Sequence, residues 1–64
     1  MVFNMKTYEI YFIDDENNVR AETFKDCENE IQALNMLLTA TIQHDTPITM
    51  ILSIKRLKDI MLDI

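Results

Sequence analysis

The sequence of 64 residues contains no glycine and no tryptophan, and it has only one proline, one cysteine and one histidine. A single cysteine excludes an intrachain disulfide, and one cysteine with one histidine leaves too few ligands for a structural zinc cage. Without glycine, a backbone position with positive φ must be filled by another residue, and asparagine tolerates that conformation best. We therefore expect a domain that binds no cofactor and no metal.

Long apolar segments are missing as well. No uninterrupted apolar run is long enough to span a bilayer, and the N-terminus lacks the charged and then apolar layout of a signal peptide. These features predict a cytoplasmic protein without membrane association. We expect residues 1–64 to form one domain with 1–5 as a loose extension, because Met5 followed by Lys6 is itself a natural start. A domain this small buries only about 60% of the surface of its unfolded chain, which favours self-association.

Basic residues are scarce in the first three quarters of the chain. Residues 1–47 hold nine acidic and three basic residues, a net charge of −6, whereas residues 48–64 hold two acidic and three basic residues, a net charge of +1. Nucleic acids are poor partners for such a surface, because their affinity comes chiefly from lysine and arginine contacts with phosphates. The charge predicts a protein partner with a basic surface and no direct contact with nucleic acid.

The sequence does contain a regular succession of patterned segments. Apolar and polar residues alternate over 6–13, 19–24 and 48–57, which predicts three strands. The acidic turn DDENN joins the first two, and its two asparagines, Asn17 and Asn18, are expected to take the positive φ angles of a tight hairpin.

Residues 28–43 have apolar residues at helical spacing and predict an amphipathic helix, with Asp26 as its N-cap. We expect its apolar face to form the core with a sheet. The fold class is then α+β, with the helix on one face of a three-stranded antiparallel sheet of order 2-1-3. The residues of the predicted apolar face are Ile31, Leu34, Leu37, Leu38, Thr41 and Ile42.

The third strand would be a long apolar edge, which proteins rarely leave bare. Strict alternation assigns Ile48, Met50, Leu52 and Ile54 to one of its faces. Residues 57–64 fit a helix and an extended segment equally well, and they are too apolar to be left in solvent. A homodimer that uses this strand or the tail is expected, and a monomer whose tail covers its own sheet is the alternative. The expected dimer contacts are Ile51, Leu57, Ile60 and Met61.

The sequence shows no recognisable set of catalytic residues. His44 stands next to Asp45, but neither a second base nor a nucleophile accompanies them. Cys27 is expected to be a buried thiol near the start of the helix. The sequence therefore predicts a protein that is not an enzyme.

The chain contains, in order, an aromatic strand, the acidic hairpin DDENN, a second strand, a helix and a last strand ILSIKRLKDI. This succession resembles the small acidic inhibitors encoded by bacteriophages. The uracil-DNA glycosylase inhibitors of some phages share this order, a dimeric habit and an acidic and apolar surface. The resemblance implies an inhibitor that imitates DNA with carboxylates in place of phosphates and encloses one protruding apolar side chain of the enzyme. The predicted helix of this chain has no aromatic residue, in contrast to that pattern.

The expected function is therefore that of a non-enzymatic protein-binding module. Its target would be a DNA-handling enzyme, either uracil-DNA glycosylase or a defence nuclease, in the cytoplasm of a host cell. The alternative is an accessory or structural subunit that docks through an edge strand and the apolar tail. The expected partner-binding residues are Asp14, Asp15, Glu16, Glu22, Asp26, Glu28 and Glu30, with Tyr11 and Met36 as apolar neighbours, and the acidic residues are expected to form two clusters.

Overall fold

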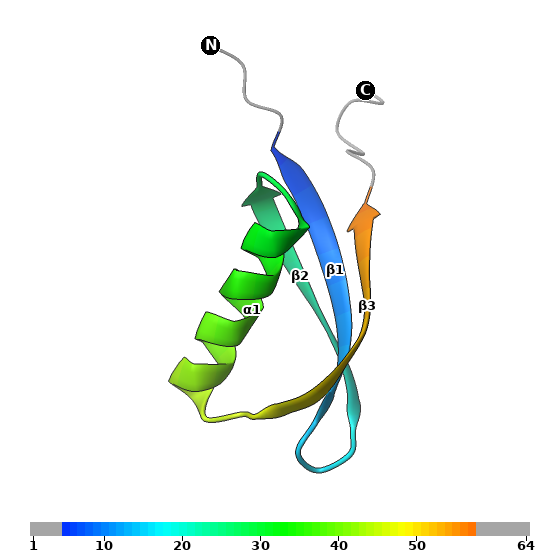
Figure 1. Cartoon of the computed structure of the whole chain (residues 1–64), viewed down its shortest axis with the longest axis vertical. Coiled ribbons are helices and arrows are strands. Elements are labelled where there is room, and N and C mark those ends of the chain that lie inside the picture. Colours follow the sequence, from blue (N-terminus) through cyan, green and yellow to red (C-terminus); the bar gives the residue numbers. More distant parts are fainter. Residues whose placement is uncertain (1–4, 58–64) are drawn as a thin grey trace.

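The computed structural model describes residues 5–57. It contains three strands and one helix in the order β-β-α-β, and the sheet has the order β2-β1-β3 with antiparallel neighbours (Figure 1). The predicted fold class and strand order are confirmed. Residues 1–4 of the predicted extension 1–5 and residues 58–64 of the predicted apolar tail 57–64 lie outside the described residues. The elements are β1 (Lys6–Asp14), β2 (Val19–Cys27), α1 (Glu30–His44) and β3 (Ile48–Leu57).

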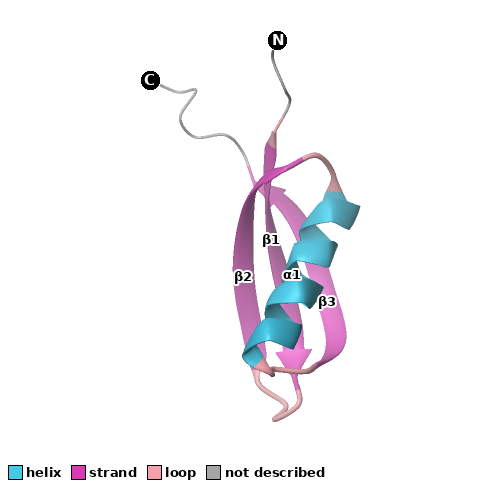
Figure 2. Cartoon of the chain, turned by 90° about the vertical axis from the view of Figure 1, so that its left-hand side faces the viewer, coloured by secondary structure: helices cyan, strands magenta, loops and turns pink. Residues whose placement is uncertain are grey.

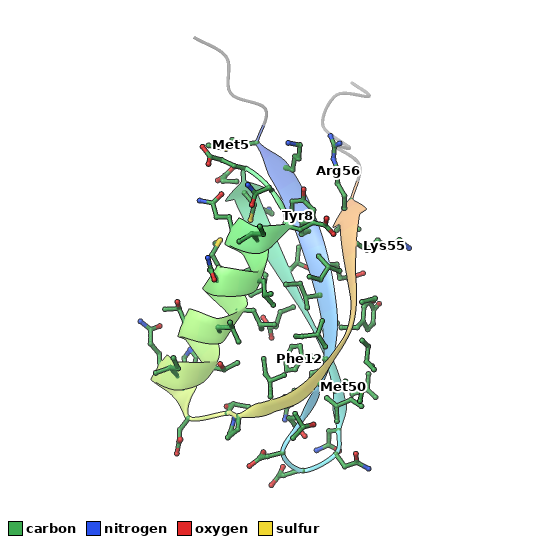
Figure 3. The ribbon with its side chains drawn as sticks, viewed as in Figure 1. Met5, Tyr8, Phe12, Met50, Lys55 and Arg56 are labelled. Atoms are coloured by element: carbon green, nitrogen blue, oxygen red, sulfur yellow. The ribbon has the colours of Figure 1, made fainter. Side chains whose placement is uncertain are left out.

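The hydrophobic core is centred on β1, the middle strand. Tyr8, Ile10 and Phe12 alternate with more exposed residues, so all three face the same side of the sheet and are almost completely buried. Phe12 lies between the sheet and α1, whereas Lys55 of β3 extends from the opposite side (Figure 3). Because β1 pairs along its length with both neighbours, its position fixes the register of the whole sheet.

The helix begins later than the sequence predicts, and its N-cap is Asn29 instead of Asp26. The Asn29 side-chain oxygen accepts a hydrogen bond of 2.9 Å from the backbone N–H of Gln32, and the side chain of Gln32 accepts one from the backbone N–H of Glu28. This reciprocal arrangement resembles a capping box. Asp26 cannot serve as the cap, because β2 continues to Cys27 and holds Asp26 within the strand at a φ of 61°.

At the end of the helix a residue other than glycine takes a positive φ angle. Asp45 takes the left-handed conformation, with a φ of 54°, at the position where glycine is most common. In the β1–β2 hairpin Asn17 has a φ of 66°, so the prediction for Asn17 is confirmed, whereas Asn18 does not have a positive φ. One positive φ angle is enough because the hairpin closes with the backbone N–H of Asn17 donating to the carbonyl of Asp14.

The buried face of α1 is rotated from the predicted one. Ala33 and Leu37 are buried and Leu34 packs against the core, but Ile31 is 70% exposed and Ile42 is 80% exposed. Leu38, at 43%, is also exposed. The small side chain of Ala33 lets the helix lie close to the sheet, and Leu37 fills the space one turn later. The sequence pattern of large apolar residues could not show this, because the contact is made through an alanine.

Strict alternation also gave the wrong faces for β3. Two irregularities in the pairing of β3 with β1 shift its phase, at Tyr11/Phe12 and at Ile13/Asp14. Each is a position where a β-bulge inserts an additional residue and turns the following side chain to the other face. As a result Ile48, Ile51 and Ile54 all pack against the core.

The second face of the sheet has no covering layer among residues 5–57, because α1 lies on the other side (Figures 1 and 2). A row of apolar residues crosses this open face near the hairpin, where Ile13 pairs with both Val19 and Met50. Val19 is 64% exposed and Met50 is 55% exposed. Both β2 and β3 are edges of this sheet, as predicted for β3.

Candidate protein-binding surface

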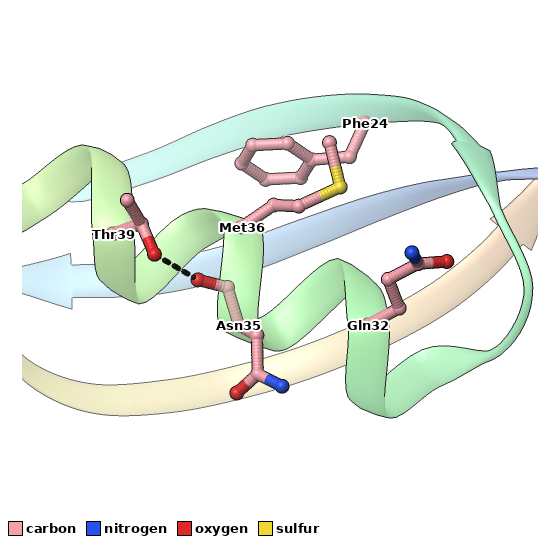
Figure 4. A pocket seen from close by; sticks show the side chains of 5 residues that line it. All are labelled: Phe24, Gln32, Asn35, Met36 and Thr39. Atoms are coloured by element: carbon pink, nitrogen blue, oxygen red, sulfur yellow. Dashed lines mark hydrogen bonds between the residues drawn. The ribbon is translucent and has the colours of Figure 1, made fainter.

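A shallow apolar groove lies between α1 and β2 and has a volume of about 370 Å³. Phe24 of β2 forms one wall, and Met36 of α1 lies beside its ring (Figure 4). A thioether beside an aromatic ring is a favourable and adaptable contact, and methionine can change its rotamer to fit different ligands. Three polar residues of the helix complete the lining, Gln32, Asn35 and Thr39.

Polar atoms in the groove wall are partly used within the helix. The Thr39 hydroxyl donates a hydrogen bond of 2.9 Å to the carbonyl oxygen of Asn35, and the Gln32 side chain is engaged at the helix start (Figure 4). The groove therefore offers mainly apolar surface, which suits the insertion of one apolar side chain from a partner. Met36 is 38% exposed and is the predicted partner-binding residue that the structure places in this groove.

A buried thiol contacts Met36 from within the core. The Cys27 Sγ atom lies 3.5 Å from the Met36 Sδ atom and within 3.7 Å of the carbonyl oxygens of Phe24 and Lys25. Burial raises the pKa of the Cys27 thiol, and the nearby carboxylate of Asp26 raises it further. Cys27 is buried, as the sequence predicts, and a buried thiol with a raised pKa is expected to react slowly.

Acidic residues that do not themselves line the groove stand close to its lining residues in β2 and at the helix start. Glu22 pairs with Ile10 and Phe24 pairs with Tyr8, so Glu22 and Phe24 lie two residues apart on the same face of β2. Asp26 follows near the end of β2 and Glu28 just before α1, and all three acidic residues are exposed. The backbone N–H of Glu28 is bonded to Gln32, which places Glu28 at the N-terminal end of the groove.

One lysine contacts this acidic surface. The Nζ atom of Lys6 donates a hydrogen bond of 3.0 Å to the backbone carbonyl oxygen of Glu28. The bond goes to the backbone, so the Glu28 carboxylate is not used in it. Glu30 lies in the first turn of α1, where the positive end of the helix dipole favours an acidic side chain.

Asp14 does not belong to the binding surface that the sequence predicted. Its side chain is 2% exposed, and its Oδ1 atom accepts hydrogen bonds of 2.9 Å from the backbone N–H groups of Glu16 and Asn18. Its Oδ2 atom accepts one of 2.6 Å from Nε of Arg20. The bond from Arg20 is the largest cause that lowers the pKa of Asp14 to about 2 from its ordinary 3.8. Asp14 is thus a structural part of the hairpin, because its oxygens satisfy the turn.

The other acidic residues of the hairpin, Asp15 and Glu16, are exposed in the turn itself. The hairpin turn and the start of α1 lie at opposite ends of the sheet (Figure 1). The structure therefore separates Asp15 and Glu16 from the acidic residues beside the groove. Two acidic clusters were expected, and the described residues have this arrangement.

The remaining predicted contact residues are dispersed. Tyr11 is 38% exposed but pairs with Ala21 and Ser53 on the open face of the sheet, away from Met36. Among the predicted dimer contacts, Ile51 packs against the core, whereas Leu57 pairs with Thr7 on the open face. Ile60 and Met61 lie outside the described residues. The structure does not gather these residues into one surface.

Residues 5–57 contain neither a candidate metal site nor a helix that could span a membrane. Histidine, cysteine, aspartate and glutamate side chains do not gather there in a group of three that could hold a metal ion. The one described helix is too short to cross a membrane. His44 is exposed in the last turn of α1. The groove with its flanking carboxylates is thus the best candidate for a functional surface.

Comparison of the chain with known protein families, curated proteins and solved structures finds no match. Sequence patterns did not identify Phe24, Gln32, Asn35 and Thr39 as part of a site. The spacing of Gln32, Asn35 and Thr39 was the sequence signal for this side of the groove, because residues three and four apart share one helix face.

Proposed function

We propose that this chain is a non-enzymatic module that binds and blocks a basic site on another protein. The observation that supports this function is the apolar groove of Phe24 and Met36 with exposed carboxylates on its borders. A DNA-handling enzyme presents the complementary chemistry, because its DNA-binding site is basic. The proposed target is uracil-DNA glycosylase or a defence nuclease in the cytoplasm of a host cell, and the proposed inhibitor is of the phage type.

The two parts of the surface have different roles in this proposal. The carboxylates of Glu22, Asp26 and Glu28 attract the basic site and accelerate the encounter. Met36 and Phe24 then surround one apolar side chain of the enzyme, and its desolvation holds the complex together. Phe24 of β2 supplies the aromatic residue that the helix lacks.

A charge-matched pair of variants tests the role of the acidic residues. Glu22→Gln with Glu28→Gln removes two charges beside the groove, and Asp15→Asn with Glu16→Gln removes two charges at the hairpin turn. The measurement is the rate constant of association with purified uracil-DNA glycosylase and with a purified nuclease, at low and high salt. We expect the first variant to associate about tenfold or more slowly at low salt, and the second to stay close to the parent. Equal effects of both pairs would show that only net charge matters.

A second pair tests the groove. Met36 is 38% exposed in the groove and Met50 is 55% exposed on the open face of the sheet. We expect Met36→Ala to accelerate dissociation of the inhibited complex, and Met50→Ala to leave it unchanged, because only Met36 would contact the bound side chain. Faster dissociation with Met50→Ala alone would place the contact on the other face.

The open face and the edge of β3 support a second candidate, an accessory subunit that docks into a larger assembly by strand addition. Ile13, Val19 and Met50 form a continuous apolar row there. Such a contact depends on backbone hydrogen bonds and apolar burial, so high salt weakens it little. Binding that persists at high salt and is lost with Met50→Lys would favour this candidate over the inhibitor.

A further inference from the structure

The helix has a second apolar stripe that does not face the sheet. Ile31 is 70% exposed, Leu38 43% and Ile42 80%. At 3.6 residues per turn, the stripe of residues 31, 35, 38 and 42 is centred about 150° around the helix from the buried pair Ala33 and Leu37. An amphipathic surface helix normally carries polar and charged residues on that side. We call the four residues Ile31, Asn35, Leu38 and Ile42 the outer seam.

Charge is absent from the whole length of the helix that carries the outer seam. Residues 31–43 include no aspartate, glutamate, lysine, arginine or histidine, although 27% of the chain is charged. Depletion of charged residues at exposed apolar positions is typical of the centre of a protein interface. An uncharged surface of this kind offers no carboxylates that could attract a basic partner, in contrast to the surroundings of the groove. It suits a partner surface that is equally apolar and uncharged.

The outer seam is complementary to itself. The intervals between its residues are four, three and four, which read the same in both directions and correspond to the a and d positions of a heptad. If two helices lie antiparallel, Ile31 of each copy faces Ile42 of the other, and Asn35 faces Leu38. A self-complementary patch is what a two-fold dimer requires, because both copies use the same surface.

Electrostatics selects the antiparallel orientation. The chain carries a net charge of −5, and Glu28 and Glu30 stand at the start of α1. A parallel pair would bring these carboxylates of the two copies together. An antiparallel pair instead places Glu30 near the end of the other helix, where His44 and the negative end of the dipole lie.

We propose that a second copy of this chain occupies the outer seam, so that the two α1 helices pack antiparallel. The outer seam shares Asn35 with the lining of the groove between α1 and β2, whereas Phe24 and Met36 lie outside the seam. Four side chains from each copy form a small contact compared with the roughly 1,000 Å² of a stable interface. We therefore expect self-association at micromolar to millimolar concentration.

Charge-swap variants test both the surface and the orientation. The average mass is measured by sedimentation equilibrium over that concentration range, and circular dichroism checks that each variant is folded. The parent is expected to approach twice the chain mass of 7.6 kDa. Ile31→Glu alone and Ile42→Lys alone should each remain at the mass of one chain. The double variant should recover the dimer, because in the antiparallel arrangement the two introduced charges of opposite sign face one another.

Matched controls carry the same charge changes on the open face of the sheet. Val19→Glu and Met50→Lys alter residues that are 64% and 55% exposed, and both should dimerise like the parent. A parent that stays monomeric at millimolar concentration would overturn the proposal. The proposal would also be overturned if the control variants were monomeric while the seam variants Ile31→Glu and Ile42→Lys remained dimeric. Failure of the double variant to recover the dimer would contradict the antiparallel arrangement.

Discussion

Leu37 and Leu38 are adjacent in sequence and chemically identical, but Leu37 is 1% exposed and Leu38 is 43% exposed. Replacing each by alanine therefore tests the orientation of α1 with the smallest possible change. Alanine has a helix propensity at least as high as leucine, so neither substitution weakens the helix itself. Any difference between the two variants comes from burial.

The expected magnitudes differ severalfold. Leu37→Ala leaves a cavity next to Ile10 and the other core residues and should cost about 2–5 kcal/mol. Leu38→Ala removes a side chain that is still partly hydrated and leaves no enclosed cavity, so its cost should be about 1 kcal/mol. A domain of 64 residues has a total stability of about 3–10 kcal/mol, so the Leu37 variant should be close to unfolding.

The assay is urea unfolding followed by circular dichroism, at the lowest workable protein concentration so that self-association does not add stability. We expect the order parent, Leu38→Ala, Leu37→Ala from most to least stable, with a thermal midpoint about 10 °C or more lower for Leu37→Ala. An equal loss in both variants, or a larger loss in Leu38→Ala, would refute the helix orientation described above.

Four further outcomes are expected. Because the folded-state pKa of Asp14 is lowered from 3.8 to about 2, its contribution to stability is complete above about pH 4 and is lost as the pH falls toward 2. The urea midpoint of Asp14→Asn should therefore be lower than that of the parent at neutral pH, and the two midpoints should converge near pH 2. A difference in midpoint that stays constant with pH would contradict the role of Asp14. Asn29→Ala should cost about 1 kcal/mol in a urea melt because it removes the helix cap, and an unchanged melt would leave the cap without a role. The Cys27 thiol should react slowly with a thiol reagent in the folded protein and rapidly in urea, because it is buried and its pKa is raised; immediate labelling of the folded protein would show that it is accessible. A chain that ends at Lys58 should still self-associate, and loss of the dimer on this truncation would assign the contact to the tail.

Much of the fold follows from local patterns in the sequence. Alternation over 6–13 located β1 and its core residues because the extra residues at the pairing irregularities belong to β2 and β3, so that β1 itself alternates strictly. The bounds of β3 were predicted as they are found, since Pro47 and the apolar run mark them. The strand order follows from the simplest closure of a strand, strand, helix, strand succession, which places the first strand in the middle and the third beside it.

The orientation of side chains was harder to predict than the elements. Bulges in β3 have no glycine to indicate them, so alternation assigned Ile51 to the wrong face. The three-residue spacing of Ile48, Ile51 and Ile54 was the only trace of them in the sequence. For α1 the buried face was assigned from its large apolar residues, which include those of the outer seam, and the small buried Ala33 was overlooked. A helix with apolar residues on two faces does not show from its sequence which face is buried.

The candidate surface was only partly predictable for a related reason. Acidic composition identified Glu22, Asp26 and Glu28, but it could not separate them from Asp14, whose carboxylate is used inside the hairpin. Whether a carboxylate is free depends on hydrogen bonds between residues that only the folded hairpin brings together. The groove likewise requires the contact of Phe24 with Met36 across two elements.

Inhibition is the most direct test of the proposed function. The chain is titrated into uracil excision by purified uracil-DNA glycosylase and into DNA cleavage by a purified nuclease, with the parent, Met36→Ala and Met50→Ala compared at low and high salt. We predict that the parent inhibits at least one of these activities at low salt, that Met36→Ala is the weaker inhibitor, and that Met50→Ala matches the parent. No inhibition of either enzyme by the parent at micromolar concentration, or inhibition that Met36→Ala leaves unchanged, would contradict binding through the groove between α1 and β2.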